Sequence, residues 1–203
     1  MQLLAMISML VDHIGKIFFQ EQLEWRFIGR LAFPIYAYCI VLGFQRTANL
    51  KKYLIRLAIL AAVSQYPYMI GLKTPGINAV GTLLICLAVL AALERYKIFL
   101  QSIIIAAAFI VLEGLPFDYG GYGLLLILIY KHSKGHVMFV SHLLLDLSFI
   151  LYKGWVYQPF STFATYGFVY APSLYSYFER FRVPKWIWRS FYPAHLMALA
   201  LIA

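Results

Sequence analysis

Two adjacent ionisable residues, Asp12 and His13, lie inside the first long apolar stretch of the chain, between MQLLAMISMLV and IGKIFF. Ionisable groups at membrane depth are costly, so such a pair marks a candidate functional site. Histidine is the usual general base in enzymes, and a nearby carboxylate can orient and charge it. Because neighbouring helical residues point about 100° apart, we expect His13 to act with a carboxylate from another helix.

Asp12 also has a purely structural interpretation, which stays open at this point. It precedes Lys16 by four residues, and an i, i+4 pair can neutralise itself on one helix face.

In the next apolar stretch, IGRLAFPIYAY, Pro34 leaves the carbonyl of Arg30 without its helical hydrogen bond. A freed carbonyl beside a guanidinium predicts a kink that water can reach. A kink with an ion pair and no chemistry fits equally well.

Further polar residues are expected at the same membrane level as Asp12 and Arg30. Together they predict one cavity in the outer half of the membrane; they are Ser64, Gln65, Asn78, Thr82, Glu113 and Asp118. Two other histidines stand apart. His142 is spaced i, i+4 from Asp146, which allows a hydrogen-bonded pair, and His195 is the one histidine of the last apolar stretch.

The composition indicates whether these residues lie in a soluble protein or in a membrane protein. The 203 residues are 63% hydrophobic and 12% charged, with a mean hydropathy of +0.78. Soluble domains are typically about 45–50% apolar and about 25% charged. This excess of apolar surface predicts an integral membrane protein. Cys39 and Cys86 lie within apolar runs and are predicted to be buried free thiols.

Nine apolar stretches must position the polar residues, each near the ~20 residues that cross a hydrocarbon core of ~30 Å. Continuous apolar runs favour helices, because the strands of a β-barrel alternate. We therefore predict an all-α integral membrane protein, a single domain over residues 1–203 with about 8–10 transmembrane helices and nine as the best count. The stretches are 1–19, 26–46, 53–70, 77–94, 98–114, 117–131, 136–152, 158–174 and 186–203.

Lysines and arginines give the orientation, because cytoplasmic loops are richer in them. The basic side is formed by Arg46, Lys51, Lys52, Arg56, Arg95, Lys97, Lys131, Lys134, Arg180, Arg182, Lys185 and Arg189. The N-terminus is therefore predicted in the cytoplasm and, with nine crossings, the C-terminus outside. The net charge of +9 follows mainly from this topology and does not indicate nucleic-acid binding.

Several chemistries have no support in the sequence. It has no Gly-rich phosphate loop, no Walker motif and no serine nucleophile elbow. No spacing of His, Cys and acidic residues suggests a zinc site, so no bound metal is predicted.

A set of motifs, in order along the chain, resembles the TraX family: VDHIGKIFF, IGRLAFPIYAY, GFQRTANLKKYLIRL, SQYPY, INAVGTLL, DYGGYGLLLILIY and FYPAHL. The resemblance runs from about residue 3 to residue 200. It implies a polytopic protein of the bacterial cytoplasmic membrane, with a link to N-terminal acetylation of pilin and to membrane acyltransferases that use acyl-CoA. The residues at matching motif positions are Asp12, His13, Arg30, Asn78, Asp118 and His195. Gln65 and Met69 depart from the family pattern, which has acidic residues there.

What the resemblance implies is acetyl transfer from cytosolic acetyl-CoA to an amine or hydroxyl, with pilin or another envelope molecule as the acceptor. His13 would be the base, and Arg30 or Asn78 would stabilise the oxyanion. The phosphates of acetyl-CoA would bind among Arg46, Lys51, Lys52, Arg95 and Lys134.

Two alternatives from other functional classes remain open. A proton-linked transporter or flippase would use the same cavity, with the acidic and histidine residues as proton relays. A non-catalytic assembly factor would need Asp12, His13 and Arg30 only for stability.

Overall fold

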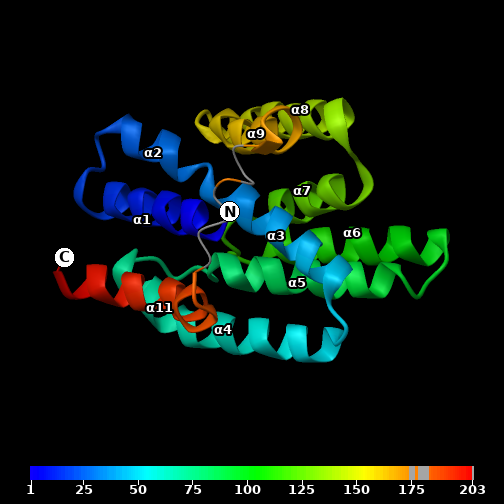
Figure 1. Cartoon of the computed structure of the whole chain (residues 1–203), viewed down its shortest axis with the longest axis horizontal. Coiled ribbons are helices and arrows are strands. Elements are labelled where there is room, and N and C mark those ends of the chain that lie inside the picture. The colour runs from blue at the N-terminus through cyan, green and yellow to red at the C-terminus, as the bar shows by residue number, and fades with distance from the viewer. Residues whose placement is uncertain (174–176, 178–182, 203) are drawn as a thin grey trace.

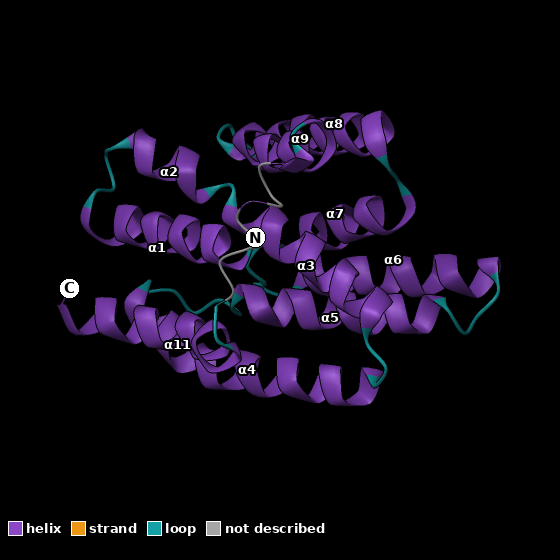
Figure 2. Cartoon of the chain, viewed as in Figure 1, coloured by secondary structure: helices purple, strands orange, loops and turns teal. Residues whose placement is uncertain are grey.

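The structure is a computed structural model that describes residues 1–173, 177 and 183–202. Within these residues the chain is built of helices, and its one β-type pairing is an isolated bridge between Ile77 and Phe117. Figure 2 shows the helices joined by short loops. The expected all-helical fold is therefore confirmed for the described part of the chain.

The helices follow the predicted apolar stretches closely at most positions. They are α1 (Gln2–Phe18), α2 (Leu23–Gly29), α3 (Ala32–Arg46), α4 (Leu50–Gly71), α5 (Ala79–Leu93), α6 (Ile98–Gly114), α7 (Gly120–His132), α8 (Gly135–Lys153), the 3₁₀ turn η1 (Gln158–Ser161), α9 (Thr162–Tyr170) and α11 (Lys185–Ile202). Figure 1 shows most of them running roughly along the long axis of the molecule.

The predicted stretch 26–46 is two helices with a break at Arg30 and Leu31. This break lies where Pro34 removes a backbone donor, as the sequence predicts. The stretch 158–174 is the short η1–α9 pair, and residue 174 lies outside the described residues. In contrast, α4 does not end at Pro67 but continues to Gly71. One missing hydrogen bond there is compatible with a helix that packs along α5 and α11.

Three helical stretches in the described residues are long and apolar enough to cross a membrane: Leu23–Arg46, Leu50–Gly71 and Gly135–Lys153. The 17-residue α6 is also strongly apolar, yet Leu112 is its one buried residue. Ile98, Phe99 and Ile110 of α6 are 69–77% exposed. Apolar side chains so exposed along a whole helix indicate apolar surroundings.

The core lies where α3, α5 and α7 pack together. Tyr122, Leu124 and Leu126 of α7 are completely buried, as are Cys86 and Leu87 of α5. Both cysteines are free; Cys86 is buried and Cys39 is half-buried. The other helices surround this core, with α1 against α2 and α3, and α11 against α4.

Three connections lie toward the same end of the long axis in Figure 1: α3 to α4, α5 to α6, and α7 to α8. These connections carry or adjoin Arg46, Lys51, Arg95, Lys97 and Lys134, which the sequence assigns to one side. Arg180 and Arg182, assigned to the same side, lie outside the described residues.

Candidate functional site

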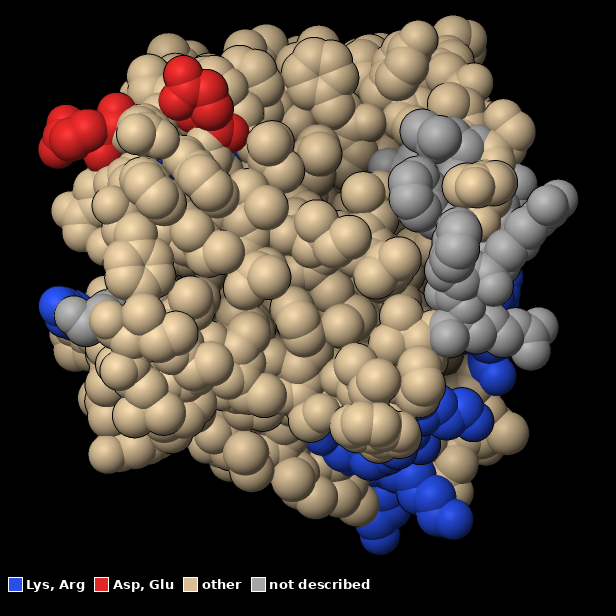
Figure 3. Space-filling view, turned by 60° about the vertical axis from the view of Figure 1, so that its left-hand side comes forward, with Lys and Arg blue, Asp and Glu red and all other residues tan. Residues whose placement is uncertain are grey.

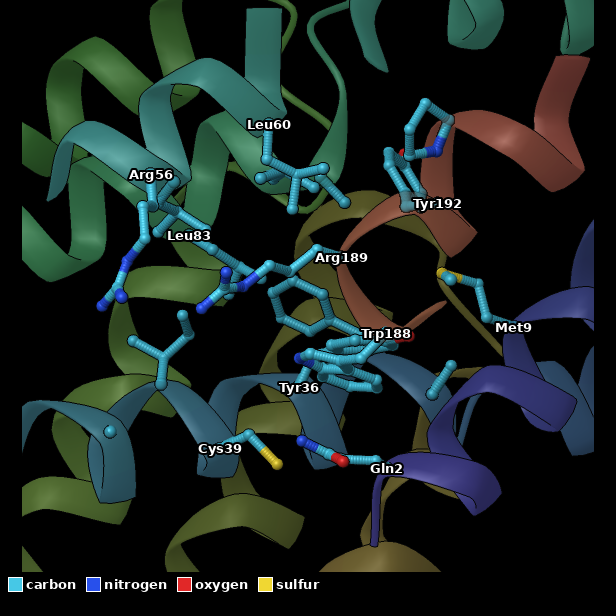
Figure 4. A pocket seen from close by; sticks show the side chains of 18 of the residues that line it. Gln2, Met9, Tyr36, Cys39, Arg56, Leu60, Leu83, Trp188, Arg189 and Tyr192 are labelled. Atoms are coloured by element: carbon cyan, nitrogen blue, oxygen red, sulfur yellow. The ribbon is translucent and has the colours of Figure 1, made fainter. Parts of the chain in front are cut away.

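A cavity of about 1110 Å³ lies between α1, α3, α4 and α11 and reaches the starts of α5 and α7. At its inner end it is lined by buried Asp12 and His13 and by Lys16 and Asp118. At the other end, which we call the rim, its lining includes the exposed Arg46, Arg56 and Arg189. Figure 4 shows part of the lining, with Arg56 and Arg189 directed toward the same region.

His13 is joined to His195 of α11, which the sequence did not place beside it. The Nδ1 of His13 lies 2.7 Å from the Nε2 of His195, and the Nδ1 of His195 lies 2.6 Å from the carbonyl oxygen of Phe191. A carbonyl only accepts hydrogen bonds, so the Nδ1–H of His195 donates to it. The Nε2 of neutral His195 then accepts the Nδ1–H of His13. This relay leaves the lone pair on the Nε2 of His13.

The Nε2 of His13 has no hydrogen-bond partner among the described residues, while His13 lines the cavity. An imidazole held in one tautomer by a partner on its far nitrogen is the arrangement of a general base. The partner we expected from the sequence was a carboxylate. The structure supplies a second histidine instead, because α11 packs across α1.

Asp12 forms its ion pair within its own helix, with the Nζ of Lys16 3.0 Å from Oδ2. The i, i+4 interpretation is therefore correct for this contact. The other carboxylate oxygen, Oδ1, is buried and has no hydrogen-bond partner in the described part of the chain. A Cβ added to Gly29 would collide with Asp12, so glycine lets the end of α2 approach this carboxylate closely. Asp12 and Lys16 thus present a carboxylate and an ammonium group to the cavity.

Arg30 lies behind the cavity wall, at the break between α2 and α3. Its Nη1 donates to the Oε1 of Gln158 at 3.2 Å, and the residue is not among those that line the cavity. It interacts electrostatically with Asp12, Asp118 and Tyr119. Arg30 therefore helps to balance the charges at the inner end without contacting the cavity.

Asp118 is positioned by the backbone of two loops that meet before α5 and α7. The backbone N–H of Asp118 donates to the carbonyl of Ile77 at 2.8 Å, and the Thr82 hydroxyl donates to the carbonyl of Asp118. Tyr119 follows with a φ of 65°, a conformation uncommon for residues other than glycine. Its ring stacks on Phe33, with 3.7 Å between ring centres. These contacts turn the Asp118–Tyr119 segment toward the cavity.

Asn78 has a structural role and does not line the cavity. Its Oδ1 accepts from the N–H of Gly81 and caps α5. Its Nδ2 donates to the carbonyl of Ala61 and to the Oε1 of Gln65, both at 2.8 Å. With the side-chain amide engaged in this way, the expected role of Asn78 as an oxyanion donor loses its geometric basis.

His142 and Asp146 form the predicted pair, but in a separate and fully buried network. Their Nε2 and Oδ1 atoms are 3.5 Å apart, and both residues are 0% exposed. Hydroxyl groups from α7, η1 and α9 complete the network, namely Tyr122, Tyr130, Ser161, Thr162 and Thr165. These residues tie α7, α8 and α9 together.

Of the five cations expected to bind acetyl-CoA, the cavity lining includes Arg46 but not Lys51, Lys52, Arg95 or Lys134. Arg56, Lys185 and Arg189 belong to the basic side predicted from the sequence, although no sequence motif assigns them to a site. All three line the cavity. Among the described residues no group of three or more His, Cys, Asp or Glu is placed to hold a metal ion.

Comparison with known proteins identifies the family. A family model described as TraX protein matches residues 1–203. The chain belongs to the TraX family. A probable fimbrial assembly protein, FimC of serogroup H1 from Dichelobacter nodosus, is 33% identical over 78 residues, which are 35% of this chain and 32% of that protein. The match thus covers about a third of that relative's length. No solved structure matches this TraX-family chain.

Four of the segments that resemble TraX meet at the inner end of the cavity. VDHIG lies on α1, GRLAFP spans the break before α3, DYGG begins α7, and FYPAH lies on α11. These four segments are far apart in sequence, and their polar residues converge through packing. In this TraX-family protein the site is therefore assembled by tertiary structure.

Proposed function

We propose that this protein is a membrane-embedded acyltransferase that moves an acetyl group from cytosolic acetyl-CoA to an amine or hydroxyl acceptor. The observation that carries the proposal is the His13–His195 relay, which leaves an unprotonated Nε2 on a residue that lines a large cavity. Lys16 places a positive charge one helical turn from His13.

The chemistry requires one base and one stabilising cation. The Nε2 of His13 takes the proton from the acceptor nitrogen or oxygen as this atom attacks the thioester carbonyl carbon. The carbonyl oxygen becomes negative in the tetrahedral intermediate, and the Lys16 ammonium stabilises it. The carbon–sulfur bond then breaks, the sulfur receives the proton from His13, and the products are the acetylated acceptor and free CoA.

We further propose that the protein spans the bacterial cytoplasmic membrane about nine times, with its N-terminus in the cytoplasm. Support comes from the three long apolar helices, the exposed apolar surface of α6, and the basic connections toward one end of the molecule (Figure 1). In this orientation the rim of the cavity faces the cytosol, where acetyl-CoA is available, because Arg46 belongs to the basic side.

The proposed acceptor is a terminal amine of a pilin-like protein. The fimbrial assembly relative supports this choice of class. Ile59 and Val63 of α4 line the flank of the cavity and are 57–58% exposed, so a segment held in the bilayer has lateral access to the site.

The test uses purified protein in lipid nanodiscs, radiolabelled acetyl-CoA and a peptide with a free N-terminal amine. We expect His13→Ala to lower the transfer rate by about 10²-fold or more. His132→Ala is the matched control, because His132 is exposed at the end of α7 and does not line the cavity. Equal rates for wild type and His13→Ala would remove His13 from the mechanism. Absence of transfer, with stability as the only property changed by alanine at Asp12, His13 or Arg30, would favour an assembly factor.

The buried His142–Asp146 network favours proton-linked transport as a second candidate function. Ionisable pairs buried inside transmembrane bundles are typical of proton relays, and the broken α2–α3 helix is typical of transporters. Proton flux in liposomes without acetyl-CoA, abolished by Asp146→Asn, would decide for this function. Flux that depends on neither His142 nor Asp146 would show that this network is not the relay, and absence of flux would exclude the function.

A further inference from the structure

Four basic side chains line the rim half of the cavity, and they come from three different helices. We call Arg46 of α3, Arg56 of α4, and Lys185 and Arg189 of α11 the rim cations. All four are exposed, and none forms an ion pair within the described part of the chain. Cations that line one end of a cavity create a positive potential there, which attracts anions.

The acidic residues of the cavity lie away from the rim cations. Asp12 and Asp118 are the two carboxylates in the lining, and both are at the inner end. Along α3 the lining runs from Ala32 to Arg46, a distance of about 21 Å at ~1.5 Å per residue. The cavity therefore has a positive rim and an inner end of mixed charge, separated by a long apolar and aromatic wall.

Neighbouring contacts direct two of the rim cations to the same region. Tyr53 packs against Gly43 near the end of α3, and the Arg56 guanidinium lies 5.9 Å from the Tyr53 ring centre. Trp188 stacks on Tyr36 with 5.0 Å between ring centres and anchors the beginning of α11, directly before Arg189. Figure 4 shows the ends of Arg56 and Arg189 pointing to one side of this aromatic pair.

We propose that the rim cations form a binding site for clustered phosphate groups, which hold a ligand whose long, thin remainder extends to His13. Arginine suits this ligand because its planar fork pairs with phosphate oxygens through two hydrogen bonds. The proposal deepens the proposed function and depends on it only for the reactive end of the ligand. The phosphates belong either to a soluble carrier such as CoA or to a lipid headgroup. These two sources can be distinguished by changing the lipid composition of the bilayer, because only the headgroup is part of it.

The experiment measures binding of inorganic pyrophosphate and of CoA to the protein in phosphatidylcholine nanodiscs, by titration calorimetry. We expect Arg56→Gln and Arg189→Gln each to weaken binding of both probes by about 10-fold, or about 1.4 kcal/mol. Lys97→Gln is the control; Lys97 is an exposed cation on the same predicted side but outside the cavity lining, and we expect less than about a 2-fold change. Unchanged thermal unfolding midpoints would show that the variants remain folded.

A second arm repeats the titrations in nanodiscs that contain phosphatidylglycerol. Competition by this lipid, lost in Arg189→Gln, would identify a headgroup as a natural occupant of the same phosphate site. Unaffected binding of CoA would identify the soluble carrier. Failure of all phosphate probes to bind, or equal weakening by Lys97→Gln, would overturn the proposal.

His13→Ala separates this proposal from the proposed function. We expect this variant to bind pyrophosphate and CoA as the wild type does while losing transfer. Phosphate binding without any acetyl transfer in the wild type would leave the phosphate site standing and reject the acetyltransferase. Acetyl transfer that is unchanged in Arg56→Gln and Arg189→Gln would instead support the acetyltransferase and reject the phosphate site.

Discussion

At the scale of single residues, the decisive contact joins His13 to His195, which are 182 positions apart in the chain. Each histidine alone on an apolar helix is an ordinary packing residue. Their hydrogen bond, continued to the carbonyl of Phe191, fixes which nitrogen of His13 carries the proton. In the proposed acyl transfer, His195 is therefore a positioning residue, since it would reach the reacting atoms only through His13.

We predict that His195→Ala lowers kcat by about 10²-fold, because His13 then loses the acceptor that holds its tautomer. The KM for acetyl-CoA is expected to stay within about 2-fold, since His195 does not line the cavity. His195→Gln should recover part of the rate, because its amide can both accept from His13 and donate to Phe191. Steady-state kinetics of the three proteins checks this, and a full rate in His195→Ala would contradict it.

Glycine at position 29 is required by the close approach of α2 to Asp12. We expect Gly29→Ala to destabilise the protein by about 1–3 kcal/mol, because the added Cβ would overlap the Asp12 side chain. Gly114→Ala is the matched control, since an added Cβ there meets no atom within 4 Å. Thermal unfolding of both variants in detergent tests this, and equal midpoints would show that α2 shifts without cost.

At the scale of helices, α5 depends on a cap that also ties it to α4. Asn78 is 1% exposed and joins the first turn of α5 to Ala61 and Gln65. The same residue type caps α4, where exposed Asn49 accepts from the N–H of Lys52 at 2.9 Å. The two caps therefore differ mainly in burial and in the number of added hydrogen bonds.

We predict that Asn78→Ala costs about 2 kcal/mol of stability, because it loses a cap and leaves buried partners unsatisfied. Asn49→Ala is expected to cost about 0.5–1 kcal/mol, as for an exposed cap. Unfolding midpoints in the same detergent give the comparison. A larger loss for Asn49→Ala would mean that the Asn78 contacts add little.

At the scale of the whole molecule, the basic and the acidic side chains lie on different parts of the surface. Figure 3 shows most of the visible lysines and arginines gathered toward one corner of this face and the acidic side chains at the opposite corner, with a broad surface between them that carries neither. This distribution is typical of a protein that crosses a bilayer with its basic end in the cytoplasm.

The proposed orientation predicts which loops an impermeant reagent reaches. After Cys39 and Cys86 are replaced by serine and alanine, a single cysteine at Lys73 or Lys153 should react with an impermeant maleimide in intact spheroplasts. A cysteine at Lys51 or Lys97 should react only after permeabilisation. Labelling of position 51 in intact spheroplasts would reverse the orientation.

The amino-acid sequence by itself determined the helical fold, the approximate helix bounds and the local pairs. Asp12–Lys16 and His142–Asp146 follow from the helical period, which places residues i and i+4 on one face whatever surrounds them. Pro34 removes the N–H that would bond the carbonyl of Arg30 and so allows a break there, although α4 continues through Pro67, where the same donor is missing.

Only the tertiary structure decided which residues share the cavity. His195 beside His13, Arg30 turned toward Gln158, and the rim cations from three helices depend on how the helices cross. Helix crossing is set by side-chain packing between segments distant in sequence, and hydrophobic periodicity gives each helix a face but not its partner. The sequence could therefore name Asp12 and His13 as the centre of a candidate site, while their partners could be found only from the fold.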